Sequence, residues 1–194
     1  MRKYYAHKKL LVFLDPIVMC VLGSLIALYL PILSDERCQP VIKGLEHIEL
    51  QRFNCEPGHF SPLTSLLFNT ESNTVKGLIK YGDILKPSTN FFFMLFWLLL
   101  TSVTYGAMIP AGLFIPSILI GCSMGHLLGS LLQSWEFISE YQSQTFAVIG
   151  AATVIAGITR TSLALAILMM ETSQDVNLFI PIMMSIIISI SVGN

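Results

Sequence analysis

Apolar residues dominate the chain in segments whose lengths suit a membrane. The first segment covers residues 10–33, and another covers residues 91–109. A helix needs about 20 apolar residues to cross a hydrocarbon core of roughly 30 Å, and both segments approach or exceed that length. Asp15 and Pro16 are typical of a helix start, so we expect the first helix to begin there and the basic residues before it to form a separate surface turn.

After residue 109 the apolar segments shorten. They cover residues 113–133, 145–157, 161–171 and 178–192, and small or polar residues separate them rather than charged loops. With a rise of about 1.5 Å per residue, a helix over residues 161–171 covers roughly half of a bilayer. Such broken helices are typical of transporters, because non-helical backbone is tolerated at membrane depth only beside protein or water. We therefore predict an all-α multipass membrane protein with broken and half-membrane helices.

A polar stretch at residues 34–88 separates the first two long segments. Its helix-breaking residues are Pro40, Pro57, Gly58, Pro62 and Pro87. Within it, the sequences SPLTSLLF and NTVKGLIKYG favour short amphipathic helices. The chain is thus divided into a basic start with a first transmembrane helix at 1–33, a lumenal or extracellular loop at 34–88, and a membrane domain at 89–194.

Charged residues are few and unevenly placed. They make up 12% of the chain, against about 25% in soluble domains, and the mean hydropathy is +0.70. The charged residues of the segment 90–194 are Glu136, Glu140, Arg160, Glu171 and Asp175. A segment with so little charge cannot form a soluble surface, so we predict that it lies in the membrane.

Basic residues ahead of the first apolar segment indicate its orientation. These residues are Arg2, Lys3, Lys8 and Lys9. They favour a cytosolic N-terminus and a non-cytosolic position for residues 34–88. The first segment is longer than the apolar core of a signal peptide and has no small-residue cleavage site. The net charge of −1 gives no support for a nucleic-acid partner.

Two of the four cysteines lie in the predicted non-cytosolic loop. Cys38 and Cys55 are there in a compartment that permits oxidation, and the sequence leaves open whether they form a disulfide or remain free thiols. Cys20 and Cys122 lie in apolar helices, where we expect buried small residues. No zinc-type spacing is present, and we predict no metal site.

The sequence PAGLFIPS interrupts the apolar pattern. Pro110 ends one helix, Gly112 permits an unusual backbone angle, and Pro116 suits the first turn of the next helix. The first N–H groups of that helix, at Leu113 and Phe114, lack intrahelical acceptors and carry part of the positive end of the helix dipole. They predict a site for a small anion without a lysine or arginine. The alternative is a proline kink whose N–H groups bond to neighbouring carbonyls or serines.

Small residues recur at every fourth position of the same helix. Ser117, Gly121, Gly125 and Gly129 form a smooth stripe that lets another backbone approach closely, so we predict a helix-packing role. His126 lies beside the stripe. A single histidine in an apolar helix favours a hydrogen-bonded structural residue over a proton carrier.

Arg160 and Glu171 lie at the two ends of a predicted short helix. They are about 16 Å apart along its axis, so they cannot pair within it and need other partners or a water interface. Ionisable residues within a membrane are functional candidates, but we favour a structural network for this pair. Because no nucleophile–base pair or phosphate loop occurs, we predict no catalytic residues and no enzyme activity.

Three stretches resemble the CLC family of chloride channels and chloride/proton exchangers. GLFIP at 112–116 resembles the family motif G-x-F-x-P, which opens a half-helix with backbone amides facing the central anion. Residues 149–194 resemble the following three family helices, including the spacing of Gly157, Arg160 and Glu171. FNCEPGHFSPLTSLLFNTESNTVKGLI is similar to the lumenal segment of the vacuolar and lysosomal branch, except that His59, Phe60 and Ser61 replace its Tyr-Asn.

The resemblance implies a fold, a ligand and partners. The fold would be the second inverted repeat of the CLC fold, in a lipid bilayer, in a lysosomal, vacuolar or other endomembrane. The backbone amides of Leu113 and Phe114 would coordinate chloride, with Gly112 enabling their exposure, and chloride would be the transported ligand with no further cofactor. The helices within 161–192 would form part of a homodimer interface.

Several family motifs have no counterpart in this sequence. They include the gating glutamate of G-[KR]-E-G-P, the serine that contacts the anion and the proton-coupling glutamate. The resemblance therefore implies that the chain requires an N-terminal half in order to transport. The leading hypothesis is chloride transport, by a voltage-gated channel or a chloride/proton antiporter, as a fragment of the full transporter. The alternative is a non-transporting assembly subunit or an inactive truncated paralogue.

Overall fold

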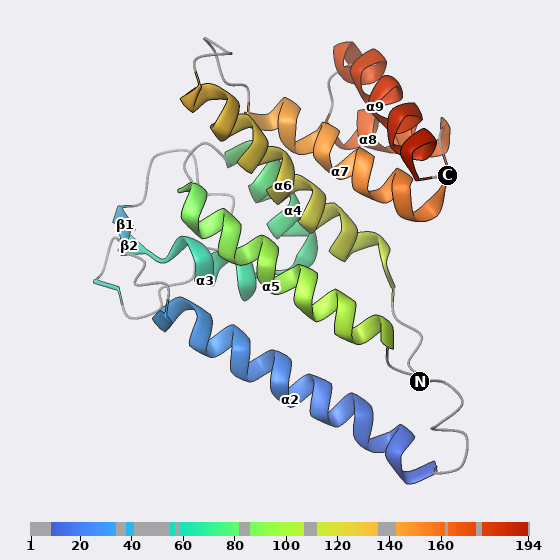
Figure 1. Ribbon diagram of the computed structural model, residues 1–194. Coiled ribbons are helices and arrows are strands. Elements are labelled where there is room, and N and C mark those ends of the chain that lie inside the picture. The colour runs from blue at the N-terminus through green and yellow to red at the C-terminus, as the bar shows by residue number, and fades with distance from the viewer. Residues whose placement is uncertain are drawn as a thin grey trace.

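The protein is a bundle of helices in the computed structural model (Figure 1). The structure describes residues 9–33, 38–40, 55–56, 59–81, 86–106, 112–135, 143–161, 163–173 and 176–193. The helices over this part are α2 (Lys9–Leu33), α3 (Pro62–Leu67), α4 (Glu71–Tyr81), α5 (Pro87–Gly106), α6 (Phe114–Ser134), α7 (Ser143–Thr159), α8 (Leu163–Ser173), the 3₁₀ turn η2 (Val176–Leu178) and α9 (Phe179–Val192). The predicted all-α class is confirmed.

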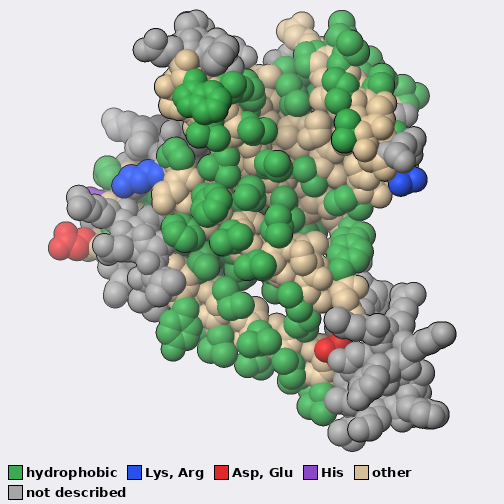
Figure 2. Space-filling model, in the orientation of Figure 1, with side chains coloured by type: hydrophobic (Ala, Val, Ile, Leu, Met, Phe, Trp, Pro, Cys, Tyr) green, Lys and Arg blue, Asp and Glu red, His purple; other side chains and the backbone are tan. Residues whose placement is uncertain are grey.

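Among the described residues, three helices are long and apolar enough to cross a membrane. They are α2, through Leu14–Pro31, α5 and α6. Helices α7, α8 and α9 are shorter, as the sequence predicts. Hydrophobic side chains cover much of the face shown in Figure 2, whereas the described charged side chains lie at its margins. The protein therefore has the surface of a membrane protein over its helical bundle.

The expected start of the first helix is wrong. Helix α2 begins at Lys9, so Asp15 does not cap it and Pro16 lies inside it, as does Pro31. A long apolar segment satisfies its backbone most fully as a helix. Pro16 removes one donor from the series, a loss that membrane helices tolerate. The surface turn expected before residue 9 lies outside the described residues.

The two short helices expected in the polar stretch are confirmed as α3 and α4. They are not a detached loop, because Leu63 and Leu78 are fully buried in the main core. Before them, strands β1 (Gln39–Pro40) and β2 (His59–Phe60) pair antiparallel. The polar stretch thus contributes both a small ribbon and part of the hydrophobic core.

The densest packing joins α6 to α7. Helix α7 lies between α6 and α9, and α4 packs against both α6 and α7 (Figure 1). The fully buried side chains at these contacts include Leu119, Val148, Ile155 and Ile182. Helix α5 covers another side of α6 and runs in the opposite direction, and α2 lies beyond it. Helix α6 is therefore held by neighbours on several sides.

Candidate anion site at the start of helix α6

The candidate site consists of the backbone at the beginning of α6. Leu113 is the N-cap residue, with φ −96° and ψ −18°, and Phe114 is the first helical residue. The carbonyl of Leu113 accepts the N–H of Ser117 at 3.1 Å and its hydroxyl at 2.6 Å. The carbonyl of Leu113 is thus satisfied by two donors of Ser117.

The amide side of this turn has no acceptor among the described residues. Within the described part of the chain, the N–H groups of Leu113 and Phe114 donate to no protein oxygen. Pro116 occupies the third helical position, where its missing N–H removes a donor that would have had no intrahelical acceptor. Two consecutive amide donors at the positive end of a helix of 21 residues form an arrangement suited to an anion.

The surroundings of the amides are only partly covered by the described helices. Phe114 is 38% exposed and Ile115 is 37% exposed, while Leu113 is intermediate. An anion therefore has access to this end of α6 in the structure. This position differs from that of Ser117, one turn later, which is buried.

The backbone of Gly112 is not left-handed, and the space around it is open. Its φ lies outside the left-handed range, and a Cβ atom placed on it would meet no atom within 4 Å. The glycine is therefore not required by local strain or by crowding from the described residues. Pro110, expected to end the previous helix, lies outside the described residues, and α5 ends at Gly106.

The stripe of small residues faces helix α7. A Cβ atom on Gly121 would lie 2.6 Å from the Cα atom of Ala151, and one on Gly125 would overlap the carbonyl of Phe146. Ser117 and Gly129 are buried on the same helix. The structure thus places α6 and α7 in direct backbone contact, as small residues in membrane helices allow.

Two hydrogen bonds hold α6 from the other sides. The side-chain nitrogen Nδ2 of Asn90 on α5 donates to the carbonyl of Ser123 at 3.0 Å. The ring nitrogen Nε2 of His126 lies 2.6 Å from the carbonyl oxygen of Leu78 on α4. A carbonyl only accepts, so Nε2 carries the proton and donates. We call these four residues the polar clamp.

Sequence reasoning identified only one member of the polar clamp. The hydrogen-bonded role expected for His126 agrees with its bond to Leu78. Asn90 was missed. It is followed by three phenylalanines, and it is the only amide side chain in the sequence of residues 87–106, which makes it unusual in an apolar helix. Its partner is 33 residues away, and no local pattern identifies such a pair.

Arg160 and Glu171 are not brought together in the structure. Arg160 lies in the connection between α7 and α8 rather than in α8, with φ +55°, and its guanidinium donates to the carbonyl of Gly193 at 3.3 Å. Both side chains are exposed. The argument that they occupy two ends of one helix therefore does not apply, because the chain turns at Arg160 before α8 begins.

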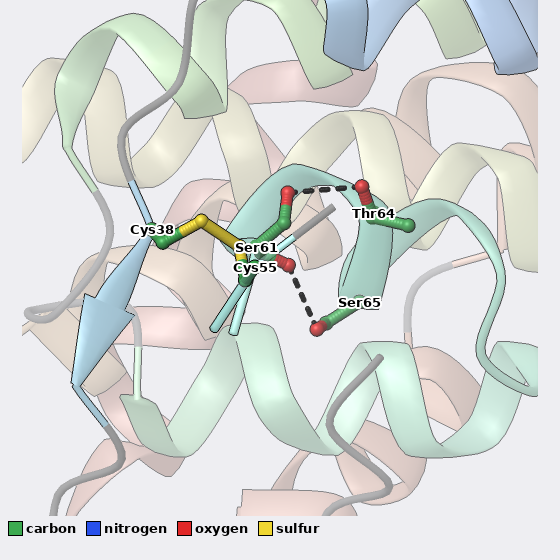
Figure 3. Close-up of a disulfide and its surroundings, with 5 residues drawn as sticks. All are labelled: Cys38, Cys55, Ser61, Thr64 and Ser65. Carbon is green, nitrogen blue, oxygen red and sulfur yellow. Dashed lines mark hydrogen bonds between the residues drawn. A yellow bond between two sulfur atoms is a disulfide. The ribbon is translucent and has the colours of Figure 1, made fainter. Parts of the chain in front are cut away.

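Cys38 and Cys55 are joined by a disulfide, with their Cα atoms 5.8 Å apart (Figure 3). The bond lies beside the start of α3, where the hydroxyl of Ser65 donates to the carbonyl of Ser61 at 2.8 Å and the hydroxyls of Ser61 and Thr64 are 2.9 Å apart. The ribbon of β1 and β2 is thereby linked covalently close to where the chain enters the core. Of the remaining cysteines, Cys122 is buried as expected, whereas Cys20 is exposed.

Comparison with known proteins identifies the family. A model of the voltage gated chloride channel family matches residues 1–194. The H(+)/Cl(−) exchange transporter 7 of Homo sapiens is 31% identical over 192 residues, which cover 98% of this chain and 24% of that protein. Chloride channel protein CLC-c of Arabidopsis thaliana is 31% identical over 185 residues, which cover 90% of this chain and 23% of that protein. The chain thus spans about a quarter of the length of these relatives. It belongs to the voltage-gated chloride channel family.

Proposed function

We propose that the chain takes part in chloride transport across a membrane, as one portion of a transporter. The observation that carries the proposal is the pair of amide groups at Leu113 and Phe114, which have no acceptor among the described residues at the start of α6. The names of the relatives support the same ligand, because they describe chloride channels and a proton/chloride exchange transporter.

The physical basis of chloride binding is a set of partial charges. The start of a helix carries roughly half a positive charge, and the N–H groups point towards the ligand. No lysine or arginine lies near this turn in the sequence, so no full counter-charge holds the ion. An ion bound in this way gains enough energy to leave bulk water but can still dissociate, as transport requires. Chloride is therefore the transported ligand, and no further cofactor is needed.

A second copy of the transporter is the partner that we propose for helices α8 and α9. Large apolar side chains line one exposed side of α9, where Ile180, Met184 and Ile188 follow each other at intervals of four residues. They are 73%, 61% and 62% exposed. Such a stripe suits a helix–helix interface within the membrane, and the same observation favours the alternative function, a subunit that serves only assembly.

The disulfide supports a non-cytosolic position for the loop at residues 34–88, because disulfides persist in oxidising compartments. We place the protein in a lysosomal, vacuolar or other endomembrane, on the similarity of its loop to that branch of the family. Fluorescence of the tagged protein at the cell surface, rather than at internal membranes, would contradict this placement.

The proposed function is tested by changing one backbone amide. Phe114 is replaced by its α-hydroxy analogue in the full transporter, which converts the N–H into an ester oxygen and leaves the side chain unchanged. We expect the chloride concentration for half-maximal flux into liposomes to rise by about fivefold, the effect of one hydrogen bond. The same replacement at Leu128, in the middle of α6, is the control. Cation flux in the unaltered protein, or equal chloride affinity in all three proteins, rejects the proposal.

A further inference from the structure

The polar clamp holds α6 from two neighbouring helices at one level. Ser123 and His126, which bond to Asn90 and Leu78, are one helical turn apart on α6. All four residues are buried, with exposed fractions of 3% for Asn90 and His126 and zero for Leu78 and Ser123. Hydrogen bonds in such surroundings define a single geometry, because an alternative position leaves a buried polar group without a partner.

The clamp involves the end of α4 and the beginning of α5. Leu78 is among the last four residues of α4, whose carbonyl oxygens receive no N–H from within the helix, and the ring of His126 supplies the missing donor. Asn90 is in the first turn of α5. Two helices that are consecutive in the chain therefore fix the same turn of α6, one through its last carbonyls and one through an amide side chain.

Helix α7 fixes α6 on a third side. Gly121 and Gly125 lie against the backbone of α7, just before and between the two clamped residues. These contacts resist rotation and separation of the helices, while the hydrogen bonds resist sliding along the axis. Close packing transmits displacements rather than absorbing them.

The clamp is distant from the amide end of α6 but rigidly connected to it. Ser123 lies nine positions after Phe114, which corresponds to about 14 Å along the helix axis. Within the described part of the chain, the side chains of Phe114 and Ile115 in the first turn of α6 are 38% and 37% exposed. Its position is therefore determined by what holds the rest of the helix.

We propose that Asn90 and His126 are positioning residues for anion binding. They set the axial position of α6 and hence the place of the Leu113 and Phe114 amides, without touching the ion. This inference rests on the proposed function. By this proposal, Asn90 and His126, which are buried between α4, α5 and α6, affect anion affinity and selectivity at the other end of α6.

The test uses the full transporter in liposomes, with three variants of Asn90 and His126 and one control variant. Asn90→Leu removes the donor to Ser123 at nearly equal volume, and it also removes the oxygen Oδ1, which has no partner within the described residues. His126→Phe removes the donor to Leu78, whereas His126→Gln retains a donor. Ser130→Ala is the matched control, because among the described residues that hydroxyl donates within α6, to the carbonyl of Leu127.

We expect Asn90→Leu and His126→Phe each to raise the chloride concentration for half-maximal flux by about fivefold and to change the nitrate-to-chloride flux ratio. The maximal rate per folded protein should stay within twofold, and His126→Gln should restore the affinity. A purely structural role would instead lower the amount of folded protein and leave affinity and selectivity unchanged.

Two results separate the failure of this inference from that of the proposed function. If the unaltered protein carries no chloride, the proposed function fails. If it carries chloride and folded Asn90→Leu and His126→Phe proteins bind it with unaltered affinity and selectivity, the positioning role is overturned. Thermal unfolding of each purified variant identifies the folded proteins to which these comparisons apply.

Discussion

Gly121 on α6 and Gly150 on α7 meet backbone to backbone. A Cβ atom on Gly121 would lie 2.6 Å from the carbonyl oxygen of Gly150, a distance that real Cβ atoms do not adopt. The atoms in the way belong to the main chain and not to a flexible side chain. The contact between the two helices therefore depends on the absence of a side chain at both positions.

The first prediction concerns this contact. Gly121→Ala should lower the free energy of unfolding by about 2 kcal/mol, because the added methyl group forces the two helices apart. The measurement is thermal unfolding of the purified protein in detergent. Gly106→Ala, at the end of α5, is the control, since a Cβ there meets nothing within 4 Å. Equal midpoints for the two variants would contradict the close contact.

The second prediction concerns Gly112. Replacement by alanine should leave the protein folded and slightly more stable, by about 0.5 kcal/mol, because the position has open space and no left-handed φ. Chloride affinity should also be retained, since the amides of the next two residues are unchanged. Unfolding and flux measurements on Gly112→Ala check both expectations. A large loss of stability would show that the glycine meets a strict conformational demand.

The third prediction concerns the disulfide. The bond closes a loop with a sequence separation of 17, so replacing Cys38 and Cys55 together by serine should cost about 3 kcal/mol. The decrease is measured as a lower unfolding midpoint, and reduction of the unaltered protein should reproduce it. Cys20→Ser is the control, because that thiol is free and exposed. Alkylation of Cys38 and Cys55 without a reductant would disprove the bond.

The fourth prediction concerns the turn between α7 and α8. Arg160 has a φ of +55°, which costs a side-chain-bearing residue about 1 kcal/mol. Arg160→Gly should therefore raise the unfolding free energy by up to that amount, offset in part by the lost bond to Gly193, which is exposed and weak. Arg160→Val should lower it. If Arg160→Gly and Arg160→Val lower the unfolding free energy by equal amounts, then the lost hydrogen bond to Gly193 rather than the backbone angle determines the choice of residue.

The membrane class and most helices could be predicted because they follow from local composition. Apolar segments of sufficient length predict helices, and residues 91–109 correspond closely to α5. The start of α6 could be predicted to within one residue, since proline and glycine act on the backbone beside them. Local chemistry also led to a wrong start for α2, where Asp15 and Pro16 resemble a cap but the apolar segment continues through them.

What could not be predicted depends on partners distant in the sequence. Asn90 meets Ser123 from 33 residues away, and Leu78 meets His126 from 48 residues away. No spacing rule connects such residues, because the path between them is set by how the helices pack. The burial of α3 and α4 was missed for the same reason: their polar composition indicated a loop, whereas Leu63 and Leu78 contribute to the shared core.

The bond between Cys38 and Cys55 also bears on the orientation of the protein in the membrane. Because the cytosol keeps thiols reduced, the bond favours the proposal that the ribbon of β1 and β2 faces the lumen or the cell exterior. On that proposal helix α2 begins at the cytosolic end, at Lys9, and in Figure 1 the last residues of α5 and the first of α6 lie towards that same end. A halide resting at Leu113 would thus exchange first with the cytosolic solution.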